Sequence, residues 1–177
     1  MSRVALIGYG YWGQKLARCF HELGVLAQIV DTDPEQLSKA IADYPHLDYG
    51  TMLRADVDSV AIATPPETHY DIAQSALKLG MNVFVEKPMT TSPMQAEELT
   101  DLAQEKGLSL MVGHIYLYNA GIQLMPIPTG QAELYVQLLN KEGGPSKSTR
   151  EVLWAALPHA VSLALHFLGK PEEINAR

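Results

Sequence analysis

The stretch Gly8-Tyr9-Gly10-Tyr11-Trp12-Gly13 decides the fold of the first part of the chain. It follows the apolar run Val4–Ile7, which is typical of a buried strand, and leads into a helix predicted over Trp12–Leu23. In a Gly-x-Gly-x-x-Gly pattern, the first glycine permits a tight turn, the second lets the backbone approach a pyrophosphate, and the third lets the helix pack closely. The stretch therefore predicts a dinucleotide site at the amino-terminus of the helix.

Asp31 adds a second feature of such a site. It ends the next predicted strand, Ala27–Val30, and lies 18 residues past Gly13. A carboxylate there can accept hydrogen bonds from the adenosine ribose hydroxyls and repels a 2′-phosphate. Because no arginine follows within Thr32–Glu35, we expect NAD to be favoured over NADP. The alternative interpretation is an ordinary glycine turn followed by a helix-capping aspartate.

The first 113 residues alternate predicted strands and helices with short connections. This alternation predicts a doubly wound parallel sheet of the Rossmann type, with helices on both faces. We expect this NAD(P)-binding domain to cover residues 1–118. Its further strands are predicted at Ser59–Ala63, Asn82–Val85 and Leu108–Val112, and its further helices at about Pro34–Tyr44, Tyr70–Leu79 and Met94–Lys106.

The pattern changes after Gly113, and residues 119–177 predict a short α+β extension for substrate binding and dimerisation. We expect a homodimer formed through the strand region of this extension, because an edge strand is a template for pairing with a second copy. The predicted elements are a short helix at Ile115–Met125, a half-buried strand at Ala132–Leu138, a polar loop at Lys141–Arg150, a helix whose first turn holds Pro158 and which runs to Leu168, and a possible strand at Glu172–Ala176.

Composition limits the classes of function. A formal net charge of −7 argues against non-specific binding of nucleic acid. The single cysteine, Cys19, allows neither an internal disulfide nor a CxxC zinc site. There is no signal-peptide pattern, and the longest apolar stretch, Val152–Leu168, is too short and too polar to cross a bilayer. We therefore expect a soluble cytoplasmic protein with no membrane contact.

Two further motifs follow predicted strands. Ala63-Thr64-Pro65-Pro66-Glu67-Thr68-His69 comes after one strand, and Glu86-Lys87-Pro88 comes after the next. Both lie at carboxyl ends of parallel strands, which is the edge where such sheets bind ligands. Together with the glycine turn, in this order and spacing, they resemble the Gfo/Idh/MocA oxidoreductase family over about residues 3 to 119. The resemblance is nearest to members that act on sugar nucleotides.

The resemblance implies a catalytic lysine. Lys87 would contact the substrate hydroxyl near the nicotinamide, and the Lys87–Pro88 bond would commonly be cis. From the residues alone, a partly buried lysine can take up the hydroxyl proton when hydride leaves a secondary alcohol; the alternative is a solvated lysine paired with Glu86. The cofactor-binding residues implied are Gly8, Gly10, Tyr11, Trp12, Gly13, Asp31, Thr64, Pro65, Pro66, His69, Glu86 and Lys87.

The later motifs match the family less completely. Gly113–Asn119 looks like the segment that enters the second domain, which makes His114, Tyr116 and Asn119 substrate candidates; the alternative is a crossover with packed aromatic residues. Where the family has Asp-x-x-x-His, this chain has Ala155 and His159. His159 is the second catalytic candidate, as an acid or base without an orienting carboxylate, or it is structural. His159 and His166 alone make a poor metal site, so no metal is expected.

Three functions are compatible with these motifs. The first is an NAD(P)-dependent dehydrogenase acting on a CH–OH group of a sugar or sugar nucleotide, with Lys87 and His159 handling the proton. The second is an inactive relative that only holds the dinucleotide. The third is an accessory subunit that supplies a cofactor domain to a partner. The glycine turn, Asp31 and the Glu86-Lys87-Pro88 motif favour the first, whereas Ala155 favours the others.

Overall fold

Strand β1 (Val4–Ile7) is buried along its whole length and is an inner strand of the sheet. This computed structural model describes residues 2–50, 56–129 and 149–170. The other elements of the sheet region are the strands β2 (Leu26–Val30), β3 (Asp48–Gly50), β4 (Ser59–Ile62), β5 (Asn82–Val85) and β6 (Leu110–Val112), and the helices α1 (Tyr11–Glu22), α2 (Pro34–Asp43), α3 (His69–Lys78) and α4 (Pro93–Lys106).

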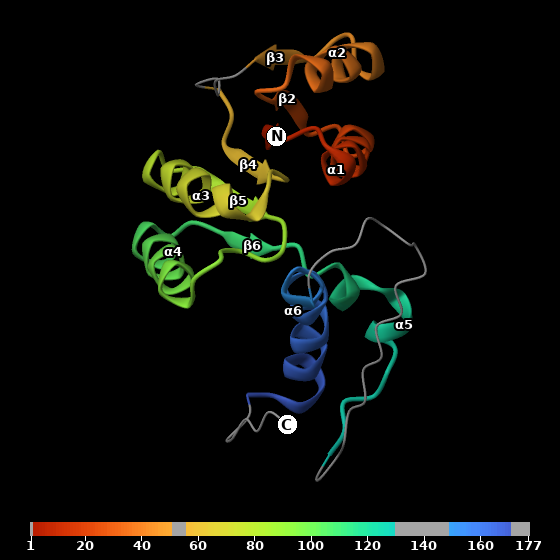
Figure 1. Cartoon of the computed structure of the whole chain (residues 1–177), viewed down its shortest axis with the longest axis vertical. Coiled ribbons are helices and arrows are strands. Elements are labelled where there is room, and N and C mark those ends of the chain that lie inside the picture. Colours follow the sequence, from red (N-terminus) through yellow and green to blue (C-terminus); the bar gives the residue numbers. More distant parts are fainter. Residues whose placement is uncertain (1, 51–55, 130–148, 171–177) are drawn as a thin grey trace. The chain divides into compact units, whose positions relative to one another are not determined.

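Within the described residues, the strand order is β3-β2-β1-β4-β5-β6, and each neighbouring pair runs parallel (Figure 1). The predicted doubly wound parallel sheet is confirmed. The chain leaves β1 toward β2 and β3 on one side, and then returns to β4 on the other side of β1. The carboxyl ends of β1 and β4 therefore flank the point where the direction of winding reverses, and this is where such sheets bind ligands.

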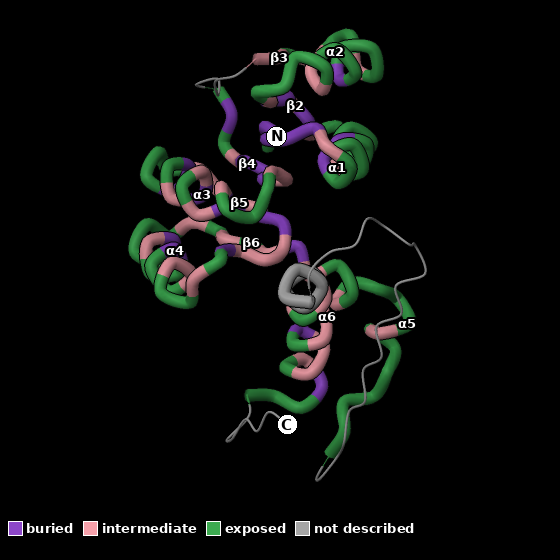
Figure 2. Tube along the Cα trace, viewed as in Figure 1, coloured by how far each residue is buried: buried purple, intermediate pink, exposed green. Residues whose placement is uncertain are grey.

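Alternate side chains of β1 enter two separate cores, one on each face of the sheet. Leu6 packs in a buried cluster that includes Ala17 of α1, and Ile7 packs in another that includes Leu77 of α3 and Leu99 of α4. Helices α1 and α2 thus cover one face, and α3 and α4 cover the other (Figure 1). Figure 2 shows the same division, with buried residues concentrated in the strands. The two cores hold the strand ends in fixed register.

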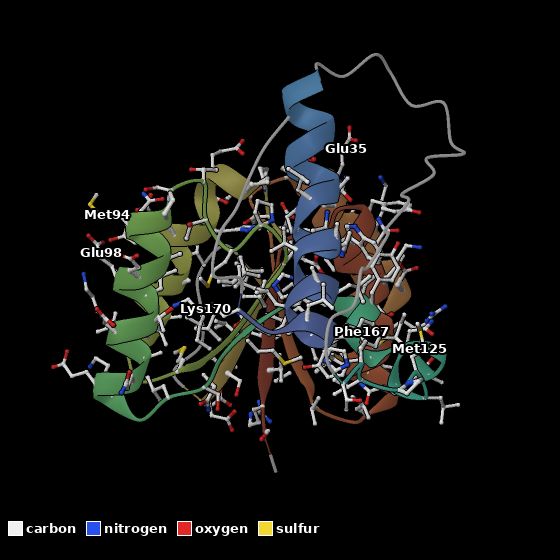
Figure 3. The ribbon with its side chains drawn as sticks, turned by 90° about the horizontal axis from the view of Figure 1, so that it is seen from below. Glu35, Met94, Glu98, Met125, Phe167 and Lys170 are labelled. Atoms are coloured by element: carbon white, nitrogen blue, oxygen red, sulfur yellow. The ribbon has the colours of Figure 1, made fainter. Side chains whose placement is uncertain are left out.

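Helix α4 shows how the sequence sets one such covering layer. Leu99 and Ala103 are buried against the sheet, whereas Met94 and Glu98 lie on the outer side of the helix (Figure 3). The helix ends at Gly107, whose φ of +64° is the left-handed conformation that glycine adopts at low cost. The predicted helices and strands of this region, from β1 to β6, begin and end within two residues of the observed ones.

Strand β3 was not predicted. It has three residues with no apolar run, and it pairs with β2 in the register Gln28 to Asp48 at the edge of the sheet. Periodicity cannot reveal a strand this short, because three residues are too few to show an alternating pattern.

The described residues form two compact units, which divide between Gly113 and His114. In the second unit, the single helix predicted at Ile115–Met125 is wrong. The structure has a 3₁₀ helix, η2 (Ile115–Tyr118), followed by a short helix, α5 (Ala120–Gln123). Asn119 separates them with an extended backbone, and its side-chain oxygen accepts a hydrogen bond from the Gly121 N–H at 2.9 Å, which caps α5.

Helix α6 (Thr149–Leu168) also differs from the prediction. The sequence predicts Pro158 in the first turn of a helix, whereas the structure has it in the interior of α6. The preceding residues 149–157 contain no glycine and several good helix formers, so the helix extends through the proline at the cost of one backbone hydrogen bond. The predicted strands at 132–138 and 172–176 lie outside the described residues. None of the helices that the structure describes is long and apolar enough to cross a membrane.

Candidate functional site

The glycine turn after β1 is built around two close backbone contacts. Gly8 has φ +94°, and a Cβ there would lie 2.8 Å from the carbonyl oxygen of Ala63 at the end of β4. A Cβ on Gly13 would lie 2.0 Å from the carbonyl oxygen of Gly8. Neither position can hold a side chain without moving the backbone. The fold itself therefore requires these two glycines, and their contacts join the carboxyl ends of β1 and β4.

Gly10 is different, because nothing in the fold requires a glycine there. Its φ is −70°, and a Cβ would have no neighbour within 4 Å. It is the N-cap residue of α1, where no side chain caps the helix and no acidic residue lies in the first turn. The first N–H groups of any helix lack partners within the helix. The mouth of α1 thus combines open space with backbone donors and a partial positive charge, which suits a phosphate group.

The carboxylate of Asp31 lies beside this turn, at the end of β2. Its Oδ2 accepts a hydrogen bond from the Tyr9 N–H at 2.7 Å, and its Oδ1 accepts one from the Asp33 N–H at 2.9 Å. Two backbone donors thus fix the orientation of the half-buried carboxylate. A carboxylate offers about four lone-pair positions, so acceptor capacity remains on both oxygens.

The buried side chain of Tyr9 holds the glycine turn against α2. Its side chain is 1% exposed, and its hydroxyl donates to Oδ2 of Asp43 on α2 at 2.6 Å. Burial, followed by the hydrogen bond to Asp43, raises the pKa of Tyr9 well above its ordinary value, so the phenol stays neutral. The same residue therefore ties the glycine turn to Asp31 through its backbone and to α2 through its side chain. The sequence did not single out this role.

The segment after β4 is organised by His69. The ring is 1% exposed, with Nδ1 at 2.8 Å from the carbonyl oxygen of Pro88 and Nε2 at 2.9 Å from that of Thr64. The Thr68 hydroxyl lies 2.7 Å from both the Thr64 hydroxyl and the Pro65 carbonyl oxygen. These contacts hold the loop after β4 against the loop after β5.

Glu86 and Lys87 follow β5 at the same edge. The Glu86 side chain is 6% exposed, and its Oε2 accepts a hydrogen bond from the Lys87 N–H at 3.2 Å. Burial raises the pKa of Glu86, whereas the N–H and charge of Lys87 and the charge of His69 act to lower it. Lys87 is half-buried, and the Lys87–Pro88 bond is cis, as the resemblance implied.

Gly113 packs directly on the Glu86 carboxylate. A Cβ at Gly113 would lie 2.9 Å from Oε1 of Glu86, so the absence of a side chain leaves room for this buried acid. Gly113 follows β6 directly, and this place at the carboxyl end of a strand is the only feature of the sequence that points to a role at the site. The first unit thus brings together, at one edge, the glycine turn, Asp31, Thr64, His69, Glu86 and Lys87.

The second unit brings two of the other candidates into contact. The rings of Tyr116 and His159 meet edge to face, with centroids 4.6 Å apart, and so join η2 to α6. Burial lowers the pKa of His114, and its Nδ1 has no hydrogen-bond partner among the described residues. The Asn119 side-chain oxygen is used as the cap of α5. Within the described part of the chain, no group of three acidic, histidine or cysteine residues could hold a metal ion.

Comparison with known proteins identifies the family. Residues 2–114 match the model of the Gfo/Idh/MocA family, described as an oxidoreductase family with an NAD-binding Rossmann fold. The chain belongs to the Gfo/Idh/MocA family. The motifs after β1, β4 and β5 lie inside the matched segment, so the resemblance noted from the sequence is confirmed.

Two curated relatives of the Gfo/Idh/MocA chain illustrate its similarity. It is 33% identical to the UDP-N-acetylglucosamine 3-dehydrogenase of Acidithiobacillus ferrooxidans, over 70% of this chain and 40% of the relative. It is 31% identical to the 4-carboxy-2-hydroxymuconate-6-semialdehyde dehydrogenase of a Sphingobium species, over 98% of this chain and 61% of the relative. The chain thus spans between 40% and 61% of the length of these relatives.

Solved structures agree with this family assignment. A putative oxidoreductase from Klebsiella pneumoniae superimposes with a TM-score of 0.76 at 30% identity, covering 96% of this chain and 51% of that one. GenD2 from gentamicin A biosynthesis, solved in complex with NAD, superimposes with a TM-score of 0.65 at 29% identity, covering 70% of this chain and 38% of that one. The similarity therefore includes a solved relative that carries NAD.

Proposed function

We propose that this Gfo/Idh/MocA chain binds NAD in preference to NADP and serves hydride transfer to or from a secondary alcohol of a sugar or sugar nucleotide. One observation carries the proposal: the open, uncapped mouth of α1 at Gly10 lies beside Asp31, whose carboxylate the Tyr9 N–H already orients. The helix mouth would hold the pyrophosphate, and the free lone pairs of Asp31 would accept the ribose hydroxyls. The negative charge of Asp31 would repel the 2′-phosphate of NADP.

The residues at the carboxyl edge supply the proton chemistry. Oxidation of a secondary alcohol removes a hydride from carbon and a proton from oxygen, and NAD supplies the hydride acceptor when it is bound. Lys87 would take the hydroxyl proton in this direction and return it in the reverse direction. Its half-buried position after β5, at the same edge of the sheet as the glycine turn, supports this role. Thr64, Pro65 and Pro66, which follow β4, would line the cofactor site.

The second unit holds the other substrate and acid–base candidates, which are the segment 114–119 and His159. The contact between Tyr116 and His159 places a substrate candidate against a candidate acid or base within one unit. A relative that acts on UDP-N-acetylglucosamine supports a sugar nucleotide as substrate. We further propose that the chain works as a homodimer in the cytoplasm, and light scattering that shows a monomer at micromolar concentration would refute the dimer.

One observation favours a second function, in which the chain binds NAD without turnover. Ala155 stands where the family motif has an aspartate, so no carboxylate at that position orients His159. Calorimetry with NAD, followed by assays across a panel of sugars and sugar nucleotides, separates the two functions. Binding with turnover that Lys87→Met abolishes supports the dehydrogenase. Binding without NADH formation, together with turnover gained in Ala155→Asp, supports the inactive relative.

A further inference from the structure

His69 lies near the proposed cofactor site, but both of its ring nitrogens contact the main chain. It is the first residue of α3, and its ring lies between the segment that follows β4 and the segment that follows β5. Both ring nitrogens lie within 2.9 Å of a main-chain carbonyl oxygen, that of Pro88 on one side and that of Thr64 on the other. The side chain is almost completely buried.

The two partners of the ring are both acceptors. A carbonyl oxygen cannot donate a hydrogen bond, so each contact requires an N–H on the ring. A neutral imidazole carries one N–H, and its other nitrogen would direct a lone pair at a carbonyl oxygen. The imidazolium form carries two and satisfies both partners. Glu86 is a titratable neighbour of the ring, and burial raises the pKa of its carboxyl.

We propose that His69 is a positioning residue, which donates from both ring nitrogens as an imidazolium and thereby ties the Thr64 loop to the Lys87–Pro88 segment. Because both nitrogens are engaged and the ring is buried, no polar atom of the side chain remains for a nucleotide. The effect on a ligand is indirect: His69 fixes the main chain on which Lys87 is placed. That consequence for catalysis rests on the proposed function, whereas the two hydrogen bonds do not.

Neither glutamine nor phenylalanine can reproduce the two hydrogen bonds of His69. Glutamine has donors at only one end of its amide, so His69→Gln would satisfy one carbonyl and direct an oxygen at the other or leave it unpaired. Phenylalanine would fill the space with no donor at all. Buried carbonyl groups without partners are costly, so both loops are expected to move apart or open more often in either variant.

The test is the protonation pattern of the ring in the full chain. Long-range proton–nitrogen NMR spectra of ¹⁵N-labelled protein at neutral pH would show each histidine as an imidazolium or as one neutral tautomer. The signals of His69 are assigned by their loss in His69→Gln, and the exposed His46 serves as the matched control through His46→Gln. We expect hydrogens on both ring nitrogens of His69. A single neutral tautomer would overturn the proposal.

Hydrogen exchange gives the second readout. In His69→Gln and His69→Phe, we expect amide exchange of Lys87 and Met89 to rise about tenfold, while amides in the middle of α4 exchange as in the wild type. His46→Gln should change neither region. Unchanged exchange at Lys87 in both His69 variants would contradict the positioning role. Calorimetry with NAD on the wild type is read separately, because absent binding refutes the proposed function and leaves the two hydrogen bonds of His69 standing.

Discussion

The backbone N–H of Tyr9 donates to Oδ2 of Asp31 at 2.7 Å, so the glycine turn and the acidic strand end form one structural unit. This bond orients the carboxylate before any nucleotide arrives. A carboxylate that is already held in place loses little conformational freedom on binding, which favours affinity. The orientation of the carboxylate at position 31 therefore depends on the conformation of the glycine turn after β1.

Replacement of Asp31 tests the ribose contact. Asp31→Asn keeps an acceptor oxygen for one of the two main-chain donors, turns an NH2 group toward the other, and removes the charge. Hydrogen bonds to charged groups contribute about 1.5–3 kcal/mol, so we expect NAD affinity to fall roughly 10- to 100-fold. The preference for NAD over NADP should shrink at the same time. Calorimetry with both nucleotides measures each effect.

Asp101→Asn is the matched control for that experiment. Asp101 is exposed on α4, which covers the opposite face of the sheet from α1, so NAD affinity should stay unchanged. Equal affinities for Asp31→Asn and the wild type would show that the carboxylate makes no contact with the nucleotide.

The glycines of the turn should separate into two kinds. Gly13→Ala places a Cβ against the backbone of Gly8 and should destabilise the fold by about 2 kcal/mol or more. Gly10→Ala meets no neighbour and should change the free energy of unfolding by less than about 1 kcal/mol. It should nevertheless abolish NAD binding, because the added methyl group occupies the space proposed for the pyrophosphate. Urea unfolding and calorimetry give the two measurements.

A Gly10→Ala variant that folds and binds NAD like the wild type would count against the proposed phosphate site. A loss of folding would instead show that Gly10, like Gly13, serves the fold.

The buried Tyr9 predicts a pH dependence at the alkaline end. An unfolded tyrosine ionises near pH 10, whereas burial and Asp43 raise the pKa of Tyr9 in the folded protein. The folded state thus keeps its proton when the unfolded state loses it, so stability from this group is complete below about pH 10 and is lost as the pH rises further. Tyr9→Phe should remove part of this loss.

The measurement compares urea unfolding of the wild type and Tyr9→Phe at neutral pH and above pH 10. At neutral pH the variant should be less stable by about 1 kcal/mol, since it lacks the hydrogen bond to Asp43. The difference should narrow at alkaline pH. Tyr44 and Tyr49 also have raised pKa values through burial, so the variant should retain some of the dependence. A gap of constant size across this range would contradict the prediction.

Gly113 and Glu86 should show coupled effects on stability. Gly113→Ala brings a methyl group within 2.9 Å of Oε1 of Glu86, so the carboxylate must move, and we expect a loss of about 1–3 kcal/mol. In a Glu86→Ala background the overlap is gone, and the same substitution should cost little. A double-mutant cycle from urea unfolding measures this coupling. Additive effects would show that the two residues do not press on each other.

Much of the first unit could be predicted from its sequence, because local signals and tertiary packing agree there. Strands β1, β2, β4 and β5 are mainly apolar runs, and glycine or proline marks most helix ends. Strand β3 was not predicted because three residues are too few to show a periodic pattern. The partners of Tyr9 could not be predicted either, because Asp43 is 34 residues away and its place depends on how α2 packs.

The second unit was harder for a physical reason. Asn119 interrupts the apolar segment after Gly113 by capping a new helix, and composition alone does not reveal this break. Pro158 indicated a helix start, but the helix-forming residues before it extend α6 to Thr149. Proline is therefore a weaker boundary signal than its usual preference for the first turn implies. The contact between Tyr116 and His159 joins two elements distant in sequence, which no local pattern predicts.

The most direct test of NAD binding at this turn is a titration of the ¹⁵N-labelled chain with NAD, followed through its backbone amide signals. We predict that the amides of residues 10–13 and of Asp31 shift saturably and by the largest amounts, because the phosphates and the ribose would contact them. Saturable binding with unchanged signals at these positions, or no binding to the folded chain, would contradict the account.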